Sequence, residues 1–98
     1  MKEEEKKKQE LYILVYNQIS NNMESELWLP YTRVKVYKDY YTALGHMVEE
    51  FNTSLESRRK QAYFNGKAEP KSEQRDGCYS IKHDTGYEEW KIEKETVE

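Results

Sequence analysis

The sequence predicts an α+β fold, in which one amphipathic helix covers one face of a four-stranded, mostly antiparallel sheet. Three observations predict it: an unbroken apolar run at residues 11–16, apolar residues at helical spacing between residues 40 and 55, and two strand patterns after residue 77. The expected order is strand, strand, helix, strand, strand (ββαββ). A chain of 98 residues has room for one small domain of this kind.

The first strand is expected at residues 11–19. Side chains alternate between the two faces of a strand, and here both alternating sets are apolar or aromatic, as in a strand that is covered on both sides. We expect the helix to cover the set Leu11, Ile13 and Val15. The opposite face then carries the set Tyr12, Leu14 and Tyr16. One helix covers only one face, so the second face needs a partner subunit, another protein or the chain's own long loop.

The second strand is expected at residues 28–37, where Val34 and Val36 alternate with Arg33 and other polar residues. Pro30 has no N–H to donate to a neighbouring strand, which indicates either an edge strand or the start of a strand. We therefore expect one face of this strand to be exposed to water.

The helix is expected at residues 39–59. Asp39 is suited to the N-cap, because its carboxylate can accept backbone N–H groups of the first turn. The apolar stripe consists of Tyr40, Leu44, Met47, Phe51 and Leu55. We expect its last four members to be buried against Ile13, Val15, Val34 and Ile81.

The rest of the chain is expected to form a tail, a loop and a hairpin. Residues 1–10 are almost entirely charged and predict a flexible tail, so the domain spans residues 11–98. Residues 61–77 predict a long basic loop. A terminal hairpin follows at residues 78–83 and 87–97, around a tight Asp84-Thr85-Gly86 turn.

The residues that can carry chemistry do not form a known motif. His46, His83 and Cys78 lack the close pairs of ligands that structural zinc requires. The carboxylates of Glu49-Glu50 and of Glu88-Glu89 are adjacent in sequence and diverge, so we expect solvated charges rather than an acid and a base. We therefore expect a protein that is not an enzyme, with no metal, cofactor or small-molecule substrate.

Charge and cysteine content indicate the compartment and an alternative function. The net charge is −3, there is one cysteine, and no apolar run is long enough for a signal peptide or a membrane span, so we expect a cytoplasmic protein. Residues 58–75 carry six basic and two acidic side chains. The alternative is therefore a nucleic-acid-binding accessory protein. Its site would consist of Arg58, Arg59, Lys60, Tyr63 and Phe64.

Protein binding is the function that the sequence favours. Nine tyrosines and two tryptophans are many for this length, and such side chains are enriched where surfaces are buried against partners. We expect a homodimer or a complex with another protein. The expected partner-binding residues are Tyr12, Leu14, Tyr16, Trp28 and Tyr31.

The general pattern of the chain resembles that of small acidic proteins from bacteriophages and bacterial mobile elements. The resemblance comes from a short tyrosine-rich chain with two hairpins around one helix and a final strand that contains Trp90 and Ile92. It implies an inhibitor or adaptor of a host machine. Acidic inhibitors of CRISPR systems that mimic nucleic acid are one such class.

Overall fold

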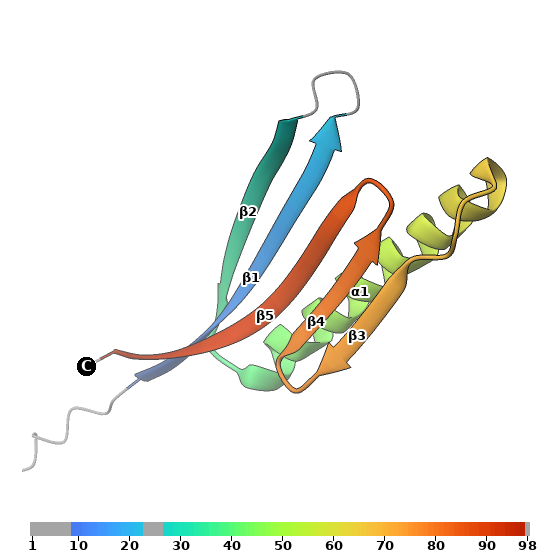
Figure 1. Ribbon diagram of the computed structural model, residues 1–98. Coiled ribbons are helices and arrows are strands. Elements are labelled where there is room, and N and C mark those ends of the chain that lie inside the picture. The colour runs from blue at the N-terminus through green and yellow to red at the C-terminus, as the bar shows by residue number, and fades with distance from the viewer. Residues whose placement is uncertain (1–8, 23–26, 98) are drawn as a thin grey trace, which may run out of the picture.

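The computed structural model of the protein describes residues 9–22 and 27–97, and for residues 21, 22 and 27–29 it describes the backbone alone. Within these residues the chain forms five strands and one helix (Figure 1). In chain order they are β1 (Gln9–Asn22), β2 (Leu27–Tyr37), α1 (Tyr40–Asn65), β3 (Lys71–Arg75), β4 (Cys78–His83) and β5 (Gly86–Val97).

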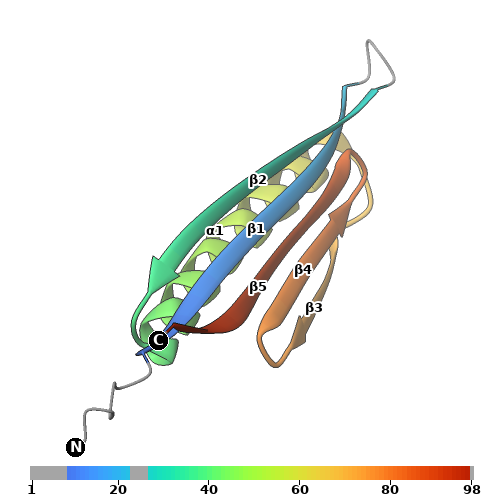
Figure 2. The ribbon, with the colours of Figure 1, turned by 90° about the vertical axis from the view of Figure 1, so that its left-hand side faces the viewer.

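The strands form one antiparallel sheet in the order β2-β1-β5-β4-β3. The helix lies on one face of this sheet, and in Figure 2 it lies behind the strands. The predicted α+β class, with one helix on an antiparallel sheet, is confirmed. The predicted count of four strands is wrong, because the order along the chain is ββαβββ. The first two residues of β1, Gln9 and Glu10, had been expected in the tail, and residues 1–8 lie outside the described residues.

The fifth strand, β3, lies inside the segment that was expected to be a long loop at residues 61–77. Part of that segment extends the helix to Asn65, and a second part pairs with β4 through a turn at Gly77, whose φ of 72° is easily adopted by glycine. Every side chain of β3 is exposed, so the strand has no apolar alternation for a pattern to detect. Its charged residues are typical of an edge strand.

The ends of α1 are set by capping groups. Asp39 is the N-cap, and its carboxylate accepts the backbone N–H of Thr42 at 2.8 Å, as expected. Gly66 takes the left-handed conformation with φ 66° after the last turn, while the N–H of Lys67 donates to the carbonyl of Ala62 at 2.8 Å. The helix therefore ends six residues later than the predicted end at residue 59.

The core lies between α1 and strands β1, β5 and β4. Phe51 is fully buried and meets the ring of Trp90 edge to face, with centroids 5.7 Å apart, and that of Tyr79 at 5.1 Å. The prediction that the helix stripe is buried is confirmed, with Leu44 partly buried at its margin. The buried core residues are Leu14, Tyr16, Met47, Phe51, Leu55, Ile81 and Trp90.

The predicted faces of β1 and β2 are inverted. Leu14 and Tyr16 lie beneath the helix, whereas Ile13, Val15 and Val34 lie on the opposite face of the sheet. Both alternating sets of β1 are apolar, so the pattern could not decide which set faces inward. The ring of Tyr16 packs on Trp90 at 5.0 Å between centroids, and this contact is available only to the inward set.

We predict that Phe51→Ala lowers the free energy of unfolding by about 3–5 kcal/mol, because it leaves a cavity between Trp90 and Tyr79. Urea denaturation followed by circular dichroism measures the change. The control is Asn52→Ala at the neighbouring exposed position, for which we expect a change within about 0.5 kcal/mol. Equal stability of Phe51→Ala and the control would remove Phe51 from the core.

Candidate interaction surfaces

A groove runs between α1 and the uncovered inner side of β1 and β2. The helix packs over β5, β4, part of β1 and the Tyr37 end of β2, where Tyr37 stacks on His46. Further along β2, Tyr31 and Arg33 border a more open space beside the helix. The groove has a volume of about 800 Å³. Its lining residues are Tyr16, Gln18, Tyr31, Arg33, Glu49, Glu50, Thr53, Ser54, Ser57, Arg58, Gln61 and Trp90.

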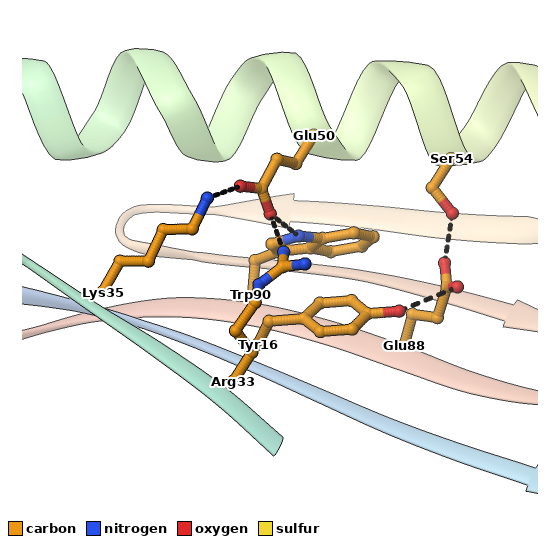
Figure 3. A network of polar contacts seen from close by, with 7 residues as sticks. All are labelled: Tyr16, Arg33, Lys35, Glu50, Ser54, Glu88 and Trp90. Atoms are coloured by element: carbon orange, nitrogen blue, oxygen red, sulfur yellow. Dashed lines mark hydrogen bonds and ion pairs between the residues drawn. The ribbon is translucent and has the colours of Figure 1, made fainter. Parts of the chain in front are cut away.

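One end of the groove is built around Glu50 of α1 (Figure 3). Its carboxylate accepts hydrogen bonds from Arg33 and, at 3.4 Å, from Lys35, both on β2. The indole N–H of Trp90 also donates to it, at 3.2 Å. The guanidinium of Arg33 lies 4.9 Å from the centre of the Tyr16 ring, a cation–π distance. These contacts hold Arg33 in place along the groove.

The other end is built around Glu88 of β5, whose side chain is almost fully buried (2% exposed). The hydroxyl of Tyr16 donates to it at 3.1 Å, Arg58 donates at 2.9 Å, and Ser54 donates a further hydrogen bond. Burial by itself raises the pKa of Glu88, but the hydrogen bonds from Ser54, Arg58 and Tyr16 and the charge of Arg58 outweigh burial and lower the pKa below its usual value. Glu88 is therefore a buried, ionised carboxylate.

The adjacent carboxylate pairs thus have a different role from the one the sequence predicted. Glu88 and Glu50 each belong to a hydrogen-bond network between the helix and the sheet, so neither is a solvated charge. Glu49, in contrast, is exposed. Neighbouring residues of a strand point to opposite faces, so one member of the pair in β5 had to face inward. The alternation of β5, with Trp90 and Ile92 on the same side, was the signal that could have placed Glu88 there.

The face of the sheet opposite the helix has an apolar half and a charged half. The apolar half, which we call the aliphatic strip, covers β1 and β2. Its members are Leu11, Ile13, Val15, Ile19, Val34 and Val36. Cross-strand pairs Ile13↔Val36 and Val15↔Val34 make its main part continuous, and the hydrogen-bonded polar pair Asn17 and Thr32 separates this part from Ile19. Val34 and Val36 are 54% and 56% exposed, so the strip is open to solvent.

The charged half of this open face covers β5, β4 and β3. Lys91 pairs with Cys78, which pairs with Arg75, and this register forms a basic row across the sheet. The next row is acidic, since Glu89 pairs with Ser80, which pairs with Glu73. Charge therefore alternates along the strands.

Four of the expected partner-binding residues lie on the helix side of the sheet and not on the open face: Tyr12, Leu14, Tyr16 and Tyr31. Leu14 and Tyr16 are buried, and Tyr12 is half-buried against the ring of Tyr40 at 5.7 Å. Tyr31 is 52% exposed at the rim of the groove, where it meets Tyr16 edge to face at 6.2 Å. The side chain of Trp28 lies outside the described residues. Of this set, the structure brings Tyr16 and Tyr31 together in the groove.

The expected nucleic-acid-binding residues are divided by the fold. Arg58 is bonded to buried Glu88, whereas Arg59 and Lys60 point to solvent. Tyr63 and Phe64 are 81% and 80% exposed on the last turn of α1, with ring centroids 5.4 Å apart. The aromatic pair is therefore accessible, and Phe64 lines a surface pocket together with Lys60.

The remaining titratable groups do not form a cluster that could hold a metal ion in the part of the chain that the structure describes. No three His, Cys, Asp or Glu side chains converge there on one point. Burial and the nearby Glu89 carboxylate raise the pKa of the Cys78 thiol, which favours the unreactive protonated form. Within the same residues, α1 is too polar to span a membrane.

Comparison of the chain with protein-family models, with curated proteins and with solved structures finds no match. The function has therefore to be inferred from the two surfaces, the groove and the open face of the sheet.

We predict that Glu88 makes the stability of the protein sensitive to acid. The pKa of Glu88 is lower in the folded chain than in the unfolded chain. Its contribution to the free energy of unfolding is therefore complete above the pKa in the unfolded chain, about 4.3, and is lost as the pH falls through the pKa in the folded chain. Glu88→Gln should lower the free energy of unfolding at neutral pH and weaken its dependence on pH below about 4.3. Urea titrations at about pH 7 and about pH 3 measure both effects.

The matched control is Glu89→Gln, because Glu89 is the neighbouring carboxylate on the opposite face of β5. It should retain most of the acid dependence of the parent protein. An acid dependence that Glu88→Gln leaves unchanged would show that Glu88 is not the group responsible.

We predict weak or undetectable binding of nucleic acid. Fluorescence anisotropy with labelled single-stranded DNA at salt concentrations between about 50 and 200 mM measures it. Tight binding that weakens steeply with salt, and that Arg59→Ala combined with Lys60→Ala abolishes, would reverse this ranking in favour of a nucleic-acid-binding function. Lys94→Ala, which changes a cation on β5, is the control for a loss of charge alone.

Proposed function

We propose that the protein is a non-catalytic protein-interaction module that self-associates as a two-fold dimer through the open face of its sheet. The observation that supports this most directly is the aliphatic strip, because contiguous exposed apolar patches commonly mark interaction sites. A second copy offers the same strip, so the two sheets can pack face to face as in a sandwich.

The edges of the sheet are less suited to self-association than its face. Pro30 interrupts the donors of the edge strand β2, and Arg33 and Lys35 add positive charge to it. At the opposite edge, the short strand β3 is charged along its length. Charges and prolines on edge strands oppose strand-to-strand association. The open face carries the exposed aliphatic side chains, so we assign the dimer contact to it.

The expected affinity follows from the surface that the strip would bury. Full burial of a Val or Ile side chain contributes about 1.5–3 kcal/mol, so covering an exposed half contributes roughly 1 kcal/mol. The strips of two copies together give a gross gain of roughly 10 kcal/mol. Association costs about 4–15 kcal/mol, so the strip alone supports a weak dimer. The charged rows beside it have to contribute as well.

The charged rows are complementary to themselves. A two-fold axis that passes between the row of Lys91 and the row of Glu89, at right angles to the strands, places Lys91 of one copy opposite Glu89 of the other. The same axis places Arg75 opposite Glu73 and Ile13 opposite Ile19. It places Val15 and Val34 opposite Asn17 and Thr32, so the apolar and polar parts of β1 and β2 alternate across the contact. Opposite charges beside the apolar half of the face would fix the register of the two copies. We propose that the protein acts by binding other molecules, as an adaptor or an inhibitor does.

We predict that Val34→Glu converts the dimer to a monomer and leaves the helix content unchanged. Glutamate at this exposed position would bring two carboxylates into the apolar centre of the interface. Sedimentation velocity or light scattering after size exclusion, at tens of micromolar protein, measures the mass. Tyr41→Glu is the control, because Tyr41 is an even more exposed apolar residue on the helix.

A charge exchange tests the register of the two copies. Lys91→Glu should weaken the dimer, and combining it with Glu89→Lys should restore it, because the rows are then reversed in both copies. A monomer mass for the parent protein at all accessible concentrations would refute self-association. In the proposed dimer, Leu14→Glu has no use as an interface variant, since Leu14 is in the core and its substitution would unfold the chain.

A further inference from the structure

We propose that the groove between α1 and β1-β2 binds an extended peptide segment of another protein. The groove lies on the helix side of the sheet, so it is separate from the aliphatic strip and stays open when two copies pack through that strip. The inference therefore stands or fails independently of self-association.

The dimensions of the groove fit a short extended peptide. Its helical wall runs from Glu49 to Gln61, which corresponds to about 18 Å along the helix axis at 1.5 Å per residue. An extended chain advances about 3.3 Å per residue, so five or six residues span this length. The groove has a volume of about 800 Å³ and is widely open to solvent, as a surface site for a peptide must be.

The charge of the groove favours a peptide over a polyanion. Arg33 and Arg58 are balanced by Glu49 and Glu50 along its walls, and the buried carboxylate of Glu88 faces Arg58. Nucleic acid would need a clear excess of positive charge. A neutral lining of mixed sign suits the alternating N–H and C=O groups of a polypeptide.

The uncharged polar groups of the groove also match a peptide backbone. The helix contributes the hydroxyls of Thr53 and Ser57 on consecutive turns and the amide of Gln61, and Gln18 contributes an amide from β1. Hydroxyl and amide groups can both donate and accept, as is needed to bind main-chain N–H and C=O groups in alternation. Apolar ligands would leave these groups without partners.

The aromatic residues of the groove indicate which side chain the peptide presents. Tyr16 and Trp90 form its floor, and half-exposed Tyr31 forms its rim. An apolar or aromatic side chain at the middle of the peptide would cover Tyr31. On either side of it, Arg33 and Arg58 retain N–H groups beyond those bonded to Glu50 and Glu88, which suits carbonyl or carboxylate acceptors.

The groove is preorganised for binding. Arg33 is fixed by Glu50 and by the Tyr16 ring, and Arg58 by Glu88 and, at 3.4 Å, by Gln61. Side chains that are already ordered lose less conformational entropy when a ligand binds. The two networks therefore prepare the polar ends of the groove before a peptide arrives.

Selection from a phage-displayed library of random peptides tests the proposal on the full chain. The enriched sequence is synthesised, and its binding is measured by calorimetry and by amide and indole chemical shifts. We expect an enriched sequence with one apolar or aromatic residue flanked by hydrogen-bond acceptors. The indole N–H resonance of Trp90, whose proton is bonded to Glu50 on the groove floor, should shift on binding.

Two neighbouring substitutions separate the groove from the rest of the surface. Thr53→Arg places a long side chain in the groove and should weaken peptide binding at least tenfold. Asn52→Arg adds the same side chain at an exposed helix position outside the groove lining and should leave binding unchanged. Val34→Glu should also retain binding, which separates this proposal from the dimer.

The proposal is overturned by any of three results. The first is a library that yields no sequence binding above background to the folded protein. The second is peptide binding of equal strength in Thr53→Arg and Asn52→Arg. The third is a bound peptide that shifts resonances of the aliphatic strip and leaves the Trp90 indole unchanged.

Discussion

The packing of Trp90 is the interaction on which the rest of the structure depends. Its indole is almost fully buried between the rings of Tyr16 on β1 and Phe51 on α1, and its N–H donates to Glu50. One side chain thus joins the central strands to the helix by apolar contact and by a directed hydrogen bond. A small domain has few such contacts, so the position of α1 over the sheet is fixed largely around this residue.

Incomplete cover of the sheet by the helix creates both candidate surfaces. One helix is narrower than five strands, and α1 lies over β1, β5 and β4. On the helix side, Tyr31 and Arg33 of β2 are left beside an open groove, while Tyr37 packs against the core. On the opposite side, none of the residues that the structure describes covers the sheet, and the apolar half of this face coincides with β1 and β2. The same edge of the sheet therefore contributes to two surfaces that face opposite ways.

The buried carboxylate of Glu88 links stability to the groove. A charge in the interior is costly unless it is paired and fully hydrogen-bonded, and here Tyr16, Ser54 and Arg58 satisfy it. These donors come from β1 and α1, so the ion holds the helix in register with the sheet. It also orders Arg58 at the groove. An apolar residue could supply packing at this position but no partner for Arg58.

The sequence by itself determined the element types, the capped start of the helix, the terminal hairpin and the burial of Met47, Phe51 and Leu55, because each follows from local spacing. It did not reveal β3, whose exposed side chains have no apolar period. Only the tertiary structure decided which face of β1 the helix covers, since both alternating sets are apolar and a shift of one residue exchanges them. Only the tertiary structure brought Glu50 and Glu88 near the groove that Tyr31 borders. These residues come together only when α1 packs across strands that are distant from it in sequence.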